Sequence, residues 1–256
     1  MKITGVSVLV LTLAAVFGLF AAPPALAQSV EPSAGGWQLE VTPYIWMVGL
    51  TGDIQAGSVS GTIEASFSDI LNSLDFGLMG LLQVRKGRFG FGFDGMYSRL
   101  TKDGTTSGAV GAGQDVHVEL VSQLYSFTVS YRALNGRVPL DLGVGVRLMP
   151  NSATLEVNPG EFPGPLASGG NTAVDGFVAA RLSVPLAGRW SLEAYADVGA
   201  GDSKLSWQAI GGLKVGLSRT VSLKLGYRYL SIHNESPDLS TKIAEGGFYL
   251  GVGIRL

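Results

Sequence analysis

A strict alternation of side-chain character is the feature that most constrains how this chain can fold. Between Leu140 and Leu148 every second residue is aliphatic, and the positions between them hold Asp141, Arg147 and two glycines. Successive side chains of a β-strand point to opposite faces of the sheet, so this pattern predicts a strand with one apolar and one polar face. The same alternation recurs in 37–41, 78–85, 89–98, 121–131, 174–186, 190–198, 204–217, 221–229 and 247–256. The sequence therefore predicts an all-β fold of about ten strands, with eight as the other count considered.

The connections between these predicted strands alternate in length. Four of them are tight turns, at Arg85–Arg88, Leu134–Arg137, Leu186–Arg189 and Leu217–Thr220. The intervening connections are longer, at Thr51–Asp75, Thr101–Asp115, Asn158–Asn171 and Asn234–Lys242, with one short exception at Gly199–Ser203. Short turns at one end and long loops at the other are typical of bacterial outer-membrane β-barrels, whose termini are periplasmic. The predicted fold is thus a closed antiparallel transmembrane β-barrel.

A soluble β-sandwich or lipocalin-like barrel would also alternate, and composition separates the two possibilities. The polar face of a soluble sheet should be rich in Lys, Glu, Thr and Gln, because glycine weakens strands. Here that face is crowded with glycine, of which the chain has 37, and only 15% of residues are charged. Small residues with isolated charges suit the lumen of a narrow barrel, where opposing walls approach closely. Composition therefore favours the membrane barrel.

Other compositional features exclude whole classes of function. The chain has no cysteine, which rules out disulfides and thiolate metal sites. Its 18 basic and 20 acidic residues lack the excess of positive charge that is typical of nucleic-acid-binding proteins. No cofactor or metal motif is present.

The N-terminal 27 residues have the form of a secretory signal. Lys2 is followed by an apolar run from Val6 to Ala22, and Ala25 and Ala27 form a small-x-small cleavage site before Gln28. We expect a signal peptide at 1–27 and a barrel domain at 28–256, placed in the outer membrane after cleavage with both termini periplasmic. Its expected partners are membrane lipids, lipopolysaccharide and the barrel-assembly machinery, and the oligomeric state is left open.

The inward face of the predicted barrel carries charges of both signs. Its acidic members are Glu40, Asp94, Asp141, Asp175, Glu193, Asp197 and Glu245, and its basic members are Arg85, Arg132, Arg147, Arg181, Lys214, Lys224, Arg228 and Arg255. Because confined charges are tolerated when they are paired, a nearly balanced set predicts an ion-pair network across the lumen. The alternative is a small polar or weakly selective channel, in which rings of charge set selectivity.

Two stretches resemble known outer-membrane sequences. The terminal YLGVGIRL, with Tyr249, Gly251, Ile254 and Leu256, is similar to the signal recognised by the barrel-assembly machinery, although most such signals end in Phe. The blocks Leu39–Ile54, Ala65–Gly80 and Gly87–Leu100 resemble a widespread, mostly uncharacterised porin-like family of bacterial outer-membrane β-barrel proteins. This resemblance implies the location and the fold, and it carries no catalytic residues.

The first long connection contains a predicted helix. Phe67, Ile70, Leu71 and Leu74 follow helical spacing, and Ser66 or Ser68 can serve as the N-cap. The helix could enter the barrel mouth as a plug or pack on the rim, since periodicity predicts only one buried face.

Aromatic residues fall near both ends of the predicted strands. Trp37, Tyr131 and Trp190 lie toward the turns, and Tyr97, Trp207 and Tyr229 lie toward the loops. This distribution is typical of the aromatic girdles of membrane barrels.

Three classes of function follow from a barrel of this kind. The one favoured by the sequence is a narrow porin-like pore with a charge-balanced lumen, and the alternative is a closed structural or surface-interaction barrel. A hydrolase using a rim histidine is a minor alternative, because His117 and His233 fall on the fourth and ninth strands, on opposite walls. No nucleophile motif accompanies them. We therefore expect a protein that is not an enzyme.

Overall fold

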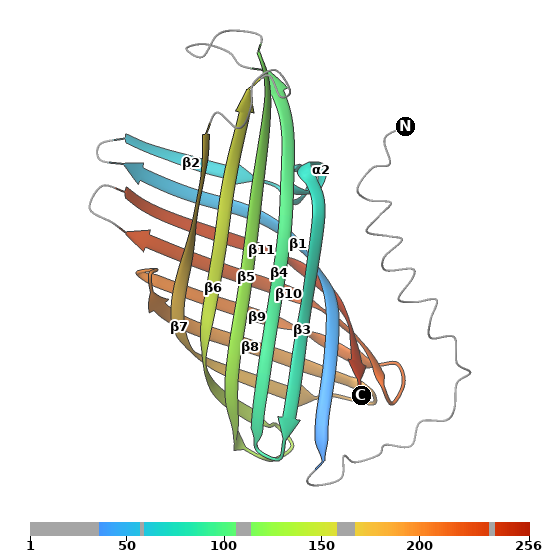
Figure 1. Ribbon diagram of the computed structural model, residues 1–256. Coiled ribbons are helices and arrows are strands. Elements are labelled where there is room, and N and C mark those ends of the chain that lie inside the picture. Colours follow the sequence, from blue (N-terminus) through green and yellow to red (C-terminus); the bar gives the residue numbers. More distant parts are fainter. Residues whose placement is uncertain (1–35, 57–58, 106–113, 158–166, 236–238) are drawn as a thin grey trace.

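The computed structural model describes residues 36–56, 59–105, 114–157, 167–235 and 239–256. Within these ranges it contains eleven strands and one short helix (Figure 1). The elements are β1 (Trp37–Ala56), β2 (Val59–Ala65), α2 (Phe67–Ser73), β3 (Leu74–Lys86), β4 (Phe89–Thr105), β5 (Asp115–Leu134), β6 (Leu140–Val157), β7 (Ala167–Pro185), β8 (Trp190–Gly201), β9 (Leu205–Gly216), β10 (Val221–Glu235) and β11 (Leu239–Arg255). The expected signal peptide, 1–27, lies outside the described residues.

Ten antiparallel strands close into a barrel, which confirms the predicted fold and strand count. The strands β3 to β11 pair in chain order, and β11 then pairs with β1 from Glu40↔Arg255 to Ala56↔Leu239. The long strand β1 pairs with β3 through its first seven residues and with the additional strand β2 through its last seven. Closure through β11 and β1 satisfies backbone groups that an open sheet would leave unpaired at its edges.

The predicted alternation of faces is confirmed by side-chain exposure. On β6, Val144 is 61% exposed on the outer face, whereas Asp141 and Arg147 are buried inside the barrel. The outer faces of the other strands are likewise apolar, with exposed side chains such as Leu78, Val178 and Phe248. Hydrocarbon would cover such a surface in a membrane, which is why apolar residues dominate it.

The connection predicted as a long loop at Thr51–Asp75 is largely regular structure, and this corrects the sequence interpretation. β1 continues to Ala56, and β2 returns beside it as a hairpin that extends beyond the barrel (Figure 1). Both strands alternate in sequence, with Leu50 and Ile54 between polar residues on β1 and with Val59 and Ile63 between polar residues on β2. The sequence predicted a loop because glycines, which are typical of turns and loops, interrupt this alternation.

The predicted helix is present as α2, and its N-cap is Ser66. The Ser66 side chain accepts a hydrogen bond from the Asp69 backbone N–H, and the Asp69 carboxylate accepts one from the Ser66 backbone N–H, which forms a capping box. Hydrogen bonds from Ser66 lower the pKa of the exposed Asp69 below its ordinary value. No residue of the helix is fully buried.

Two of the tight turns depend on glycine. Gly87 and Gly188 have φ angles of 58° and 63°, in the left-handed region that other residues rarely adopt. They lie in the predicted turns Arg85–Arg88 and Leu186–Arg189.

Glycines on the inner face make room for neighbouring groups. A Cβ atom at Gly145 would lie 2.3 Å from both the Phe127 carbonyl oxygen and the Phe177 ring. At Gly247 it would lie 2.0 Å from the Met47 carbonyl oxygen. Larger residues at these positions would require the barrel wall to shift, so the glycines are needed for close approach as well as for a small lumen.

Charge placed on the outer face should be tolerated poorly. We expect Val144→Arg to destabilise the barrel by about 2–4 kcal/mol, because an arginine near the middle of the bilayer faces hydrocarbon. Thr128→Glu is the control for a lumen-facing charge, since Thr128 pairs with Gly145 at nearly the same depth and faces a lumen lined there by more basic side chains than carboxylates. Urea titration of protein in lipid vesicles measures both changes, and equal stability of Val144→Arg and wild type would refute the assignment of faces.

Candidate functional site in the barrel lumen

The half of the lumen nearest the tight turns contains a cavity of about 290 Å³. Every barrel strand, β1 and β3 to β11, contributes lining residues. These include Glu40 on β1, Asp94 on β4, Arg181 on β7 and Lys214 on β9. The strand alternation places all of these polar groups inside, because the same strands must present apolar residues outward.

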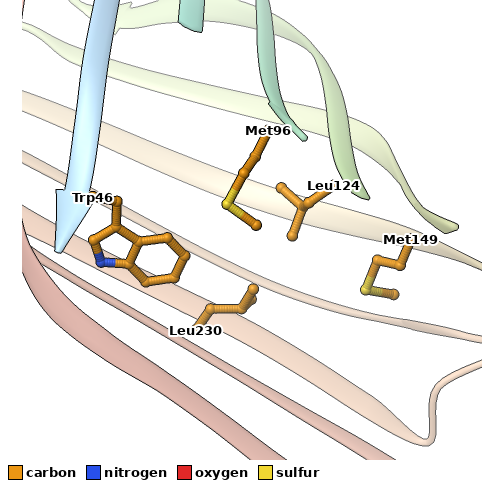
Figure 2. Close-up of a cluster of buried hydrophobic side chains, with 5 residues drawn as sticks. All are labelled: Trp46, Met96, Leu124, Met149 and Leu230. Atoms are coloured by element: carbon orange, nitrogen blue, oxygen red, sulfur yellow. The ribbon is translucent and has the colours of Figure 1, made fainter. Parts of the chain in front are cut away.

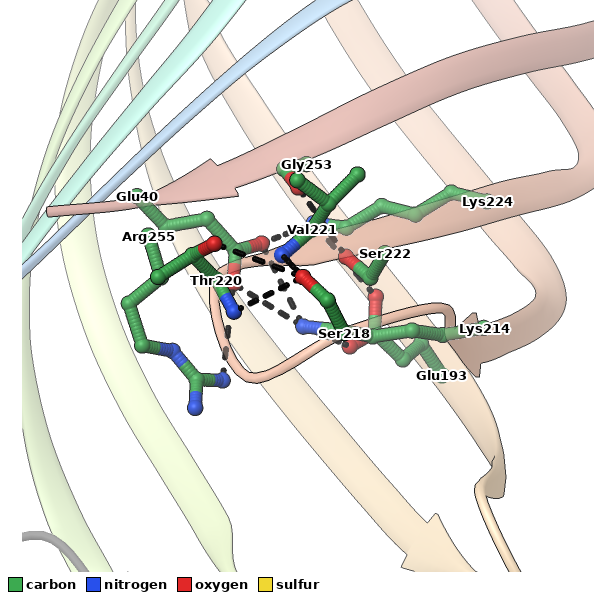
Figure 3. Close-up of polar contacts among 10 residues, drawn as sticks. All are labelled: Glu40, Glu193, Lys214, Ser218, Thr220, Val221, Ser222, Lys224, Gly253 and Arg255. Atoms are coloured by element: carbon green, nitrogen blue, oxygen red, sulfur yellow. Dashed lines mark hydrogen bonds and ion pairs between the residues drawn. The ribbon is translucent and has the colours of Figure 1, made fainter. Parts of the chain in front are cut away.

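One group of charges at the turn end gathers around Glu40 (Figure 3). The Lys214 ammonium lies 2.9 Å from a Glu40 carboxylate oxygen and 3.7 Å from Glu193, while Lys224 pairs with Glu40 at 2.5 Å and lies 3.9 Å from Glu193. Arg255 is the outermost member, 3.7 Å from Glu40 and half-exposed. Three basic groups thus share two carboxylates, and Glu40 on β1 reaches the charges of β8 to β11 through the closure of the barrel.

A second group, around Asp141, lies in the same cavity. Arg85 pairs with one Asp141 oxygen, and Arg132 donates from Nε and Nη2 to the carboxylate at 2.9 and 3.3 Å. Arg181 lines this region too, and its guanidinium lies 5.2 Å from the Tyr195 ring centroid. No ion pair of Arg181 is present among the described residues, so three guanidinium groups share one carboxylate.

A third group lies deeper, toward the loop end. Arg228 donates from Nη1 to the Tyr44 hydroxyl at 2.7 Å and pairs with Asp94 at 2.9 Å, and Tyr44 donates to the other Asp94 oxygen at 2.7 Å. The Arg228 guanidinium also lies 4.8 Å from the Trp46 ring centroid. This arrangement fixes the cation against an aromatic face at the inner limit of the cavity.

A fully buried ion pair closes the β6–β9 side of the same level. Arg147 Nη2 donates to both oxygens of Asp197 at 2.7 Å, and both side chains have zero exposure. Gln208 donates to Asp197 at 3.0 Å, and the Arg147 guanidinium lies 5.0 Å from the Phe177 ring centroid. These contacts compensate two charges that would otherwise be costly to bury.

An apolar layer crosses the lumen on the loop side of the cavity (Figure 2). We define it by its five buried side chains, contributed by β1, β4, β5, β6 and β10: Trp46, Met96, Leu124, Met149 and Leu230. On each of these strands the layer residue occupies an inward position beyond the last cavity-lining residue toward the loops. The layer therefore lies between the polar cavity and the loop end.

Sequence analysis missed this layer, although the signal was present. All five residues fall on the inward parity of strands that were correctly placed, where the lumen was expected to be polar. Extending the alternation past the last charge on each strand, for example from Arg228 to Leu230, would have found them.

The charges of the lumen are also segregated, which the overall balance of the inward face did not predict. Over the whole inner face the two signs nearly cancel, but the cavity itself is lined by seven basic side chains and four carboxylates. The four carboxylates are Glu40, Asp94, Asp141 and Glu193. Asp175, Asp197 and Glu245 do not line the cavity, so its interior is net positive.

The other predicted site residues lie apart from this cavity or at its margin. Asp175 is buried and accepts a hydrogen bond from the Ser203 backbone N–H at 2.9 Å, whereas Glu245 has no ion pair among the described residues. Of the assembly-signal residues, Tyr249 lines the cavity, Gly251 is buried, and Ile254 and Leu256 have the outward parity. Their recognition by assembly machinery stays a prediction.

The candidate plug residues take no part in closing the cavity. Phe67, Ile70, Leu71 and Leu74 are half-buried at the loop end, where α2 lies beside β1 and β4. None of them lines the cavity or belongs to the apolar layer.

The two histidines lie on opposite walls, as expected. His117 on β5 contacts Asp103 of the neighbouring strand, with Nδ1 and Oδ1 separated by 2.7 Å, and Asp103 is almost fully exposed. His233 on β10 is paired in register with Leu205 and Lys242. In the closed order of strands, β5 and β10 are five places apart, so the two histidines belong to separate sites.

Two kinds of feature are absent from the described part of the chain. No cluster of three or more His, Asp or Glu side chains in these ranges is placed to hold a metal ion. No helix in the same ranges is long and apolar enough to cross a membrane.

Comparison with solved structures identifies the class of fold. The outer membrane protease OmpT of Escherichia coli matches with a TM-score of 0.55 at 7% identity, over 90% of this chain and 99% of that one. The translocator domain of the autotransporter NalP of Neisseria meningitidis matches with a TM-score of 0.44 at 14% identity, over 99% and 96% of the two chains. Ail, the attachment invasion locus protein of Yersinia pestis, gives 0.33 at 12% identity, over 87% and 99%.

The chain therefore has the fold of bacterial outer-membrane β-barrel proteins. No family model matches it, and no curated protein is similar to it. The resemblance to one porin-like family stays a prediction, and function must be argued from the lumen.

Proposed function

We propose that this chain is an integral outer-membrane protein whose barrel is a narrow pore, closed at rest by the apolar layer. Its termini and tight turns face the periplasm in this proposal, so the polar cavity opens toward that side. The exposed apolar outer faces and the closed ten-stranded barrel support the membrane location. One observation carries the pore assignment: a single layer of buried apolar side chains lies between a solute-sized polar cavity and the loop end.

Such a layer is a suitable gate. A hydrophobic constriction blocks ions and water by dewetting, so the side chains need not fill the whole cross-section of the lumen. Four of the five members, Met96, Leu124, Met149 and Leu230, are aliphatic or thioether side chains. Methionine is unbranched and adapts its shape easily, so small rearrangements can open or close a path.

Planar-bilayer recording tests the proposal directly. We expect purified wild-type protein to give rare openings of low conductance, because the layer is closed in the resting barrel. A boiled sample of the same preparation, added in the same detergent, is the control for leaks. If neither wild type nor variants with smaller side chains in the layer showed channel openings over long recordings, the closed structural or surface-interaction barrel would be favoured.

That second function has its own supporting observation. The buried Arg147–Asp197 pair and the apolar layer beyond it both fill part of the lumen, as expected of a barrel stabilised by its own interior. A barrel of this kind would act through its outward surface.

We further propose that the protein is not an enzyme. The neighbour OmpT is a protease, but likeness at 7% identity concerns the fold alone. A catalytic base needs a reacting partner within hydrogen-bond reach, and His117 and His233 lie on opposite walls. An esterase or protease activity lost in His117→Ala or His233→Ala would overturn this proposal.

A further inference from the structure

The turn-end cavity holds more positive charge than its own carboxylates compensate, and the excess is greatest around Asp141. Arg85, Arg132 and Arg181, here called the arginine triad, come from three strands and line one part of the cavity. Arg85 lies within electrostatic range of both other guanidinium groups. Asp141 pairs with Arg85 and Arg132, and Arg181 has no carboxylate partner among the described residues. The triad thus carries two positive charges beyond its single counter-ion.

Several hydrogen-bond donors in this cavity lack partners in the protein. Arg85 Nη1 is buried without a hydrogen bond, while Nη2 of the same group is bonded to Asp141. Arg228 is 2% exposed, and its Nε and Nη2 have no partner although Nη1 is bonded twice. Buried donors without partners are uncommon, because each loses the hydrogen bonds that water would have made. Both arginines line the cavity, and a small movement of either side chain would turn an unsatisfied donor toward an acceptor there.

The cavity has the size and lining of a small-molecule site. Its volume of about 290 Å³ is close to the lower end of ligand pockets, which span roughly 300–1,000 Å³. Leu81, Ile210 and the Tyr195 ring supply apolar surface beside the charged groups. A guanidinium group binds a carboxylate or phosphate through two parallel hydrogen bonds, which a lysine ammonium cannot do.

We propose that this cavity binds a small organic or inorganic anion through a carboxylate or phosphate group held by the arginine triad. Arg181 is its principal ligand-binding residue, since it alone of the three is not engaged by Asp141. The group of Lys214, Lys224 and Arg255 has one positive charge more than its two carboxylates, and it favours a second negative charge on the molecule. This names the solute class of the proposed pore and rests on that proposal only for access from the turn end.

Isothermal titration calorimetry on the detergent-solubilised full barrel tests the site without requiring any conductance. The probes are succinate, inorganic phosphate and the neutral analogue succinamide, all at constant ionic strength. We expect saturable binding of succinate, of phosphate or of both, and none of succinamide. Arg181→Gln should weaken the binding on the order of tenfold, because one bidentate, charge-assisted contact is lost.

Arg137→Gln is the matched control, because Arg137 is exposed in the β5–β6 turn and does not line the cavity. It should bind as wild type does. Arg181→Gln leaves no carboxylate without its ion pair, and the heat-dependent gel mobility of the barrel checks that it folds. The choice between succinate and phosphate identifies which anionic group the site prefers, and either result supports the site.

The proposal is overturned if neither anion binds saturably to wild type, if succinamide binds equally well, or if Arg181→Gln binds like wild type. Its failure is distinguishable from failure of the pore. A barrel that never conducts but binds succinate keeps the anion site, and one that conducts but binds neither anion keeps the pore alone.

Discussion

Thinning the apolar layer should open the barrel. We expect Trp46→Ala combined with Leu230→Ala to raise single-channel conductance on the order of tenfold, because a wider and less apolar constriction stays wet. These two residues are 2% and 1% exposed, and both belong to the layer (Figure 2). In a salt gradient the opened pore should also prefer anions, since seven basic side chains line the cavity against four carboxylates.

Two further double variants test the same prediction if shortening the side chains of Trp46 and Leu230 weakens the fold. Met96→Gln with Met149→Gln retains side-chain length but adds hydrogen-bonding groups, so it should hydrate the layer without leaving a large cavity. Trp190→Ala with Leu225→Ala removes the same two kinds of side chain from the outer face, where both are about half-exposed. The outer pair should leave conductance unchanged. A lumen pair that folds and conducts no better than the outer pair would refute the gate.

Local rules predicted the fold well because they act on every strand separately. Alternation on β6, from Leu140 to Leu148, requires only that one face meet hydrocarbon, and the structure has that arrangement on all ten barrel strands. The turns at Gly87 and Gly188 and the capping box of Ser66 are also local features. The number of strands was predicted from the four tight turns and the two termini, because a barrel of this class has an even number of antiparallel strands.

The site was harder to predict because it depends on register across the barrel. The sequence placed Glu40 and Lys214 inside, but their 2.9 Å contact joins residues 174 positions apart and requires the closure of β11 on β1. Depth along the barrel axis was likewise not determined by alternation. It places Glu245 in register with Leu230 of the apolar layer, beyond the cavity, and so contributes to the excess of basic groups in the cavity.

The largest effect on stability is expected at the buried pair of Arg147 and Asp197. Arg147→Met should lower the free energy of unfolding by about 3–5 kcal/mol, because it leaves the Asp197 charge buried without its cation. The Gln208 hydrogen bond, at 3.0 Å, can offset only part of this cost. Guanidinium titration of protein in lipid vesicles, followed by tryptophan fluorescence, measures the change.

A second substitution separates charge burial from packing. Adding Asp197→Asn to Arg147→Met removes the remaining charge and keeps an acceptor for Gln208, so most of the lost stability should return. The exposed pair of Lys204 and Glu235 is the control, with side chains 57% and 48% exposed, and Lys204→Met should change stability little because water screens such pairs. If Arg147→Met were no more harmful than Lys204→Met, or if Asp197→Asn made it worse, the pair would not be a compensated buried charge. The closure of the lumen on the β6–β9 side would then have to depend on the Phe177 ring and its neighbours alone.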